Sequence, residues 1–204
     1  MIFNLDREFV FVHVQKTGGM SIKKALSTID GCVETNYHDF VSNLDNPEKF
    51  FKFSFVRNPF DRIVSWYNMG IKKNINSKLV GYDNTFWEYL LENSTNFSEF
   101  LNCTEKIMEY KDIGKPYFKS ISFNQLDYFK DINGNIIMDY IGRFENIKDD
   151  FDKICNLLNI NNLELPHINK FQHDDYRSYY TTKDIDKVTS LYSEDLKYFN
   201  YKFE

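Results

Sequence analysis

The stretch FVFVHVQKTGGMSIKKAL, residues 9–26, decides the fold class of this 204-residue chain. Its first part is a run of β-branched and aromatic residues, which predicts a strand over residues 9–14. The turn from Gln15 to Gly19 breaks this run, and apolar residues at helical spacing return over residues 21–26. The predicted order is therefore strand, glycine-containing turn, helix.

A second copy of this order follows in the stretch FKFSFVRNPFDRIVSWY, residues 51–67. A strand is predicted over residues 51–56 and a helix over residues 60–67, with Pro59 near the first helical position, where proline is well tolerated. Strands that alternate with helices favour a parallel sheet. We therefore expect an α/β fold, a P-loop-like three-layer sandwich with a central parallel sheet flanked by helices, in a single domain over residues 1–204.

The remainder of the chain carries weaker signals. Asn133-Gly134 between apolar runs indicates a hairpin. A strand is expected over residues 139–144, a helix over residues 147–158, and a C-terminal helix after the capping-box pattern of Thr181 and Asp184. Between residues 71 and 117 the periodicity is weak, with short helical pieces at residues 85–91 and 97–101, and this region can line a substrate cleft.

Composition limits the classes of function. The formal charge of −5 argues against a general nucleic-acid binder, which would carry a basic stripe. The three cysteines, Cys32, Cys103 and Cys155, are far apart and indicate neither a disulfide framework nor a zinc site. The first apolar run is too short for a signal-peptide core or a membrane span, so we expect a cytoplasmic protein without stable membrane insertion.

The first strand-to-helix turn has the properties of an anion-binding loop. In an α/β sheet this turn lies at the carboxyl edge, where ligands usually bind. Gly18 and Gly19 let the backbone approach an anion, and the following helix offers N–H groups and the positive end of its dipole. Thr17 and Ser21 add hydroxyls, and Lys16 adds a full positive charge.

The second turn distinguishes this chain from a P-loop kinase. Lys16 precedes the glycine pair, whereas the Walker A lysine follows its second glycine. A kinase strand commonly ends in a metal-handling Asp, but here the strand runs into Arg57, which can bind a phosphate bidentately. Ser65 lies two turns into the next helix and can add a hydroxyl, whereas Arg62 is less well placed and is interpreted as helix surface.

At these two turns the chain resembles the sulfotransferases that use 3′-phosphoadenosine 5′-phosphosulfate (PAPS), in particular the carbohydrate branch with the heparan and chondroitin enzymes and small bacterial relatives. The stretch HVQKTGGMS, residues 13–21, resembles the 5′-phosphosulfate loop, and FVRNPFDRIVSWY, residues 55–67, resembles the 3′-phosphate segment. Residues 139–147, 165–170 and 176–180 also look like later segments of this branch. The resemblance implies that the 5′-phosphosulfate is held by Lys16, Thr17, Gly18, Gly19, Met20 and Ser21, and the 3′-phosphate by Arg57 and Ser65.

The chain departs from the family pattern at two positions of the first loop. Gln15 stands where proline is frequent, and Met20 stands where threonine is frequent. Neither change removes a charge, but the change at Met20 removes a hydroxyl that could contact phosphate.

The resemblance also implies a reaction. We expect transfer of a sulfuryl group from PAPS, as co-substrate and without a required metal, to a hydroxyl of a carbohydrate or glycoconjugate acceptor. Lys16 and the helix N-terminus would stabilise charge on the leaving side. His38 is the expected general base, because it falls between the two cofactor segments, where related enzymes carry their proposed catalytic histidine.

Other histidines and other functions are weaker candidates. His13 alternates with Phe11 and is interpreted as a buried core residue. The irregular link that carries His167, Lys170, His173 and Arg177 can meet the nucleotide or an anionic acceptor, or be a solvated loop. An ATP-dependent P-loop-like kinase and a noncatalytic nucleotide-binding module remain the alternatives.

Overall fold

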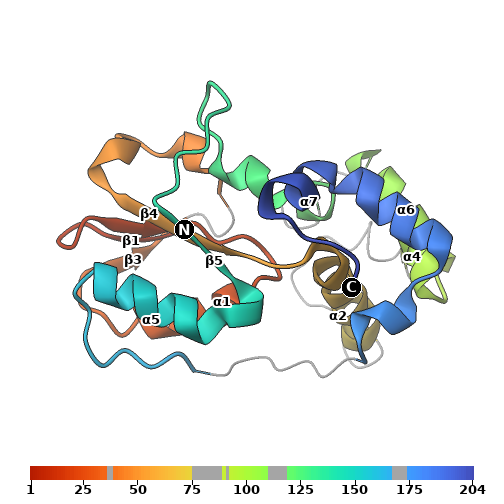
Figure 1. The fold of residues 1–204 in the computed structure, drawn as a ribbon, viewed down its shortest axis with the longest axis horizontal. Coiled ribbons are helices and arrows are strands. Elements are labelled where there is room, and N and C mark those ends of the chain that lie inside the picture. The colour runs from red at the N-terminus through yellow and green to blue at the C-terminus, as the bar shows by residue number, and fades with distance from the viewer. Residues whose placement is uncertain (36–38, 75–88, 91, 110–118, 167–173) are drawn as a thin grey trace. The chain divides into compact units, whose positions relative to one another are not determined.

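The computed structural model describes residues 1–35, 39–74, 89–90, 92–109, 119–166 and 174–204 (Figure 1). The chain divides into two compact units, each built from two stretches of sequence. Unit 1 comprises Met1–Arg57 and Gln125–Phe171, and unit 2 comprises Asn58–Asn124 and Gln172–Glu204. Strands and helices together confirm the α/β prediction.

The described residues of unit 1 form a five-stranded sheet with the order β3-β1-β2-β4-β5. β2, β4 and β5 are parallel neighbours, whereas β1 pairs antiparallel with both β2 and β3. The strands are β1 (Ile2–Asn4), β2 (Phe9–Phe11), β3 (Cys32–Glu34), β4 (Phe51–Val56) and β5 (Tyr140–Arg143).

The prediction of a parallel sheet is therefore wrong for one side of the sheet. β1 is joined to β2 by a tight turn in which the Arg7 N–H donates to Asn4 Oδ1 at 2.9 Å. A connection this short can only return the chain antiparallel, since a parallel connection needs a crossover of a dozen or more residues. The sequence pattern does not reveal β1 and β3, because three-residue strands are too short to show alternation.

Two helices cover one face of this sheet. α1 (Gly19–Leu26) and α5 (Ile147–Leu157) lie on the same side (Figure 1), and their apolar residues pack with Phe53 and Phe55 of β4. On the opposite face of β4 the Ser54 hydroxyl donates to the Val12 carbonyl at 2.6 Å. The strand over residues 51–56 and the helix beginning at residue 147 are confirmed.

The segment before β5 contains the predicted turn. Asn133-Gly134 lies in a chain reversal where Gly134 has φ +83°, and one antiparallel bridge joins Lys130 to Ile136. The Asp131 carboxylate accepts from the N–H groups of Asn133 and Asn135 at 2.9 and 2.8 Å. The reversal is confirmed, and backbone hydrogen bonds across it, such as that from the Asp131 N–H to the Asn135 carbonyl at 2.8 Å, hold it together with this side chain.

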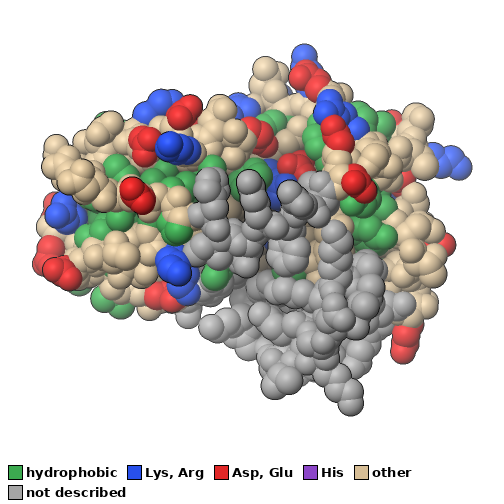
Figure 2. All heavy atoms as spheres, turned by 90° about the horizontal axis from the view of Figure 1, so that it is seen from below, with side chains coloured by type: hydrophobic (Ala, Val, Ile, Leu, Met, Phe, Trp, Pro, Cys, Tyr) green, Lys and Arg blue, Asp and Glu red, His purple; other side chains and the backbone are tan. Residues whose placement is uncertain are grey.

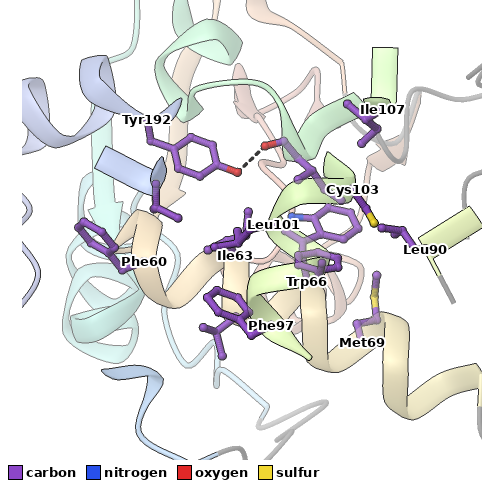
Figure 3. Packing of buried hydrophobic residues seen from close by; sticks show 14 residues of the cluster. Phe60, Ile63, Trp66, Met69, Leu90, Phe97, Leu101, Cys103, Ile107 and Tyr192 are labelled. Atoms are coloured by element: carbon purple, nitrogen blue, oxygen red, sulfur yellow. Dashed lines mark hydrogen bonds between the residues drawn. The ribbon is translucent and has the colours of Figure 1, made fainter. Parts of the chain in front are cut away.

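Unit 2 is helical in its described residues. Its core joins α2 to the C-terminal helices through Phe60, Trp66 and Tyr192 (Figure 3), and the Tyr192 hydroxyl donates to the Ile121 carbonyl. The capping box is confirmed, because Thr181 and Asp184 exchange side-chain and backbone hydrogen bonds. The α-helices are α2 (Pro59–Asn74), α4 (Phe97–Cys103), α6 (Thr182–Leu191) and α7 (Ser193–Phe199).

Arg62 of α2 has a structural role in unit 2. Its side chain is fully buried, and its guanidinium donates to the carbonyls of Ser120 at 2.8 Å and Phe123 at 3.2 Å. The interpretation of Arg62 as helix surface is therefore wrong, because the side chain is buried and donates hydrogen bonds to carbonyls in and after η4 (Lys119–Ile121).

The described surface mixes both signs of charge. On the face drawn in Figure 2, Lys and Arg side chains are interspersed with Asp and Glu side chains. No helix in the described ranges combines the length and the apolarity that a membrane crossing requires.

Candidate functional site

Three strand ends meet at one edge of unit 1. β2, β4 and β5 run parallel, and Val56 of β4 is in register with Arg143 of β5. The residues that follow these strands therefore gather at the carboxyl edge, which is the usual ligand site of such sheets. They are the loop of residues 15–19, Arg57 and Phe144.

The glycine pair is required by close packing as well as by conformation. Gly18 has φ +83°, and a Cβ built on it would lie 2.5 Å from Ile147 Cδ1. A Cβ on Gly19 would lie 2.0 Å from the ring of His13. Gly18 is the N-cap of α1 and has no side chain with which to cover the first-turn N–H groups, as an anion site at a helix N-terminus needs.

Two residues before the glycines set the path of the loop. Lys16 is half-buried and has φ +68°, a left-handed conformation that is uncommon for a residue with a Cβ. Thr17 is fully buried, and its hydroxyl donates to the Val14 carbonyl at 2.9 Å. The Thr17 hydroxyl proton is therefore already donated within the loop, and the positive charge of the loop comes from Lys16.

Arg57 connects the second junction to the first. Its Nη1 donates to the Lys16 carbonyl at 3.3 Å, and its guanidinium carbon lies 4.3 Å from the centroid of the Phe144 ring. The side chain is buried, with 6% of the residue exposed. The structure thus brings together the two turns that the sequence singles out. Arg57 also makes a cation–π contact with Phe144, which follows the third strand end.

The sequence reasoning missed two residues of this arrangement. Phe144 is the last residue of the predicted strand over residues 139–144. Its position at the carboxyl end of a strand could have marked it as a site residue. Gln125 exchanges two hydrogen bonds with the Arg57 backbone, both at 2.9 Å. No local pattern marks Gln125, since it stands 68 positions from Arg57 in the sequence.

A buried carboxylate supports the junction at Phe144. Asp150 of α5 accepts from the Arg143 N–H at 2.8 Å, and from the Tyr140 hydroxyl and Lys153 at 3.0 Å each. Burial alone would raise the pKa of Asp150, but these donors outweigh it, so the pKa lies below its ordinary value. The charged form of Asp150 therefore stabilises the end of β5.

The other predicted site residues fall in three groups. Met20 is 41% exposed on α1, and Ser21 is buried with its N–H donating to the Gly18 carbonyl at 3.0 Å. Ser65 is half-buried in α2 of unit 2. His38 lies outside the described residues, as do His167, Lys170 and His173.

Two remaining candidates can be placed. His13 is buried, with 5% exposed, and its ring stacks on Phe11 at a centroid distance of 5.5 Å, which confirms its interpretation as a core residue. Arg177 is exposed in η7 (Tyr176–Tyr179) and pairs with Asp175, its Nε donating at 2.7 Å.

Comparison with known proteins adds one decisive observation. A protein-family model described as "Sulfotransferase family" matches residues 1–202. The chain belongs to the sulfotransferase family. No curated protein and no solved structure matches it significantly.

The reaction of this family requires positive charge near the reacting group. A sulfotransferase moves a sulfuryl group between two oxygens, and negative charge develops on the leaving side. Of the residues at the edge, Lys16, Arg57 and the N-terminus of α1 carry the positive charge and the dipole that such a group needs.

Proposed function

We propose that this sulfotransferase transfers the sulfuryl group of PAPS to a hydroxyl of a carbohydrate or glycoconjugate acceptor. The observation that supports this most is the contact between Arg57 and the Lys16 carbonyl, which joins the two turns assigned to the two phosphate groups of the donor. The family match over residues 1–202 favours one sulfotransferase domain, for which we propose a P-loop-like three-layer arrangement. A cytoplasmic location remains a prediction from the sequence.

The donor would be held at both of its phosphate ends. Lys16, the backbone N–H groups from Thr17 to Met20 and the Ser21 hydroxyl would bind the 5′-phosphosulfate, since the glycine pair admits the anion to the N-terminus of α1. Arg57 would bind the 3′-phosphate, with Ser65 as a second contact. Met20 would contribute its backbone N–H.

The transfer itself needs an in-line nucleophile and a base. The acceptor oxygen would form a bond to sulfur as the bond from sulfur to the 5′-phosphate oxygen breaks, and His38 would take the acceptor proton. Lys16 and the α1 N–H groups would stabilise the charge left on the phosphate. These groups supply the required positive charge from the protein itself, so no metal is proposed.

Calorimetric binding tests the donor assignment. Adenosine 3′,5′-bisphosphate, the desulfated product, should bind without metal and more tightly than ATP with magnesium. Lys16→Ala and Arg57→Ala should each weaken this binding by on the order of tenfold or more, as expected for loss of a charge-assisted phosphate contact. Lys24→Ala is the matched control, because Lys24 is an exposed lysine of α1, the helix that follows the Lys16 loop.

Turnover tests the remaining parts. Purified protein with PAPS carrying a radioactive sulfuryl group should label a hydroxyl-bearing glycan, and His38→Ala should abolish labelling while donor binding persists. A preference for ATP with magnesium would overturn the proposal. Selective binding of the bisphosphate with no labelling of any glycan would point to a noncatalytic module.

A further inference from the structure

Arg57 is the first residue after the end of strand β4. β4 ends at Val56, and its ladder with β5 also ends there, at the pair Val56 and Arg143. The backbone N–H and carbonyl of Arg57 therefore lie beyond the strand pairing. Buried peptide groups in this position need other partners.

Gln125 provides both of these partners. The Arg57 N–H donates to Gln125 Oε1, and Gln125 Nε2 donates to the Arg57 carbonyl, each at 2.9 Å. Gln125 begins η5 (Gln125–Phe129) and is fully buried. The Gln125 amide thus forms the two backbone hydrogen bonds that a neighbouring strand would otherwise provide to Arg57. These bonds fix the backbone from which the guanidinium projects.

The guanidinium is held separately at its far end. It lies over the Phe144 ring, and Nη1 donates to the Lys16 carbonyl. Because a bidentate phosphate contact depends on the direction of the guanidinium plane, a small displacement of the Arg57 backbone would misalign it.

We infer that Gln125 is a positioning residue that sets how strongly Arg57 binds the donor's 3′-phosphate. The inference rests on the proposed assignment of Arg57 to that phosphate. Gln125 acts through the backbone of Arg57, so its loss should lower selectivity for a 3′-phosphorylated nucleotide and leave binding of the 5′ end largely intact.

The test compares two nucleotides that differ by one phosphate. The Kd values of adenosine 3′,5′-bisphosphate and adenosine 5′-monophosphate are measured by calorimetry, and their ratio reports the 3′-phosphate contact alone. Gln125→Met should lower the selectivity on the order of tenfold, since it keeps the shape of the side chain and removes both hydrogen bonds. Gln125→Asn keeps an amide but sets it one methylene back from Arg57, so it should also lower the selectivity, and it serves if the Met variant does not fold.

A matched control comes from the same unit. Asn4 is also fully buried, and its amide accepts from the Arg7 N–H and donates to the Asp30 carbonyl, both at 2.9 Å. Asn4→Leu should therefore destabilise the fold in a similar way and leave the selectivity unchanged. If it lowers the selectivity as much as Gln125→Met does, the effect is general loosening and the inference is overturned.

A double variant distinguishes the role of Gln125 from the proposed role of Arg57 in binding the 3′-phosphate. In the Arg57→Ala background, Gln125→Met should cause no further loss of selectivity, because the guanidinium that Gln125 positions is absent. If Arg57→Ala removes the selectivity but Gln125→Met preserves it, the inference fails and the proposed function stands. If the wild-type protein does not distinguish the two nucleotides, both fail together.

Discussion

At the scale of single residues, Gly19 and His13 form the tightest fit in the candidate site. The His13 ring is buried and stacked on Phe11, and a Cβ on Gly19 would lie 2.0 Å from that ring. Gly19→Ala should lower the free energy of unfolding by about 1–3 kcal/mol, the usual cost of overpacking. Urea unfolding of the variant measures this loss.

The cause of that loss can be separated from the general cost of replacing a glycine. In a His13→Ala background the Gly19→Ala penalty should largely vanish, because the obstructing ring is absent. Gly134→Ala should cost about 1 kcal/mol in either background, since its cost comes from φ +83° and nothing lies within 4 Å of its Cβ. Equal penalties for Gly19→Ala with and without the His13 ring would refute this explanation.

At the scale of secondary-structure elements, Asp150 joins α5 to the end of β5. Its two oxygens accept from Arg143, Tyr140 and Lys153, and an Asn can keep one of these acceptor positions. Asp150→Asn should therefore lower the free energy of unfolding at pH 7 by about 1–3 kcal/mol. The exposed Asp152 of the same helix provides the control variant Asp152→Asn, which should change it little.

The dependence on pH follows from the direction of the Asp150 pKa. Because this pKa is lowered in the folded protein, the charged carboxylate stabilises the fold above its unfolded pKa of about 3.9. This contribution is lost as the pH falls below that value toward the folded pKa. The difference between wild type and Asp150→Asn should thus be constant from pH 7 to about 5 and shrink below about pH 4, as urea unfolding at each pH would report. A difference that grows on acidification would contradict the assignment.

At the scale of the whole molecule, each unit is built from two separated stretches of the chain. The stretches of the two units alternate along the chain, so that part of each unit separates the two stretches of the other. We therefore expect both units to unfold in one cooperative transition. Adenosine 3′,5′-bisphosphate at 100 times its Kd should stabilise the fold by about 2.7 kcal/mol. For a chain of this length that corresponds to a rise of roughly 5–10 °C in Tm.

Scanning calorimetry with and without the nucleotide measures this directly. A single peak that moves as a whole supports one sulfotransferase domain over the chain. Two peaks, of which one moves, would show that the units unfold independently and would overturn the single-domain prediction.

Sequence patterns predict correctly those elements that depend on residues close together in the chain. The run of residues 51–56, the proline at the start of α2 and the capping box of Thr181 each depend on neighbours a few positions away, and all three are confirmed. The prediction that Lys16 and the glycine pair bind an anion is equally local, because it depends on residue type and spacing.

The distant residues that join the candidate site become visible only in the folded protein. Phe144 meets Arg57 because parallel strands bring their carboxyl ends to one edge, whereas Gln125 reaches Arg57 from η5. No short window of sequence contains either juxtaposition. The antiparallel strand β1 and the burial of Arg62 were equally hidden, since pairing and burial arise from contacts between segments far apart in the chain. Local sequence propensity determines which helices and strands form, and packing between segments far apart in the chain determines which of them pair.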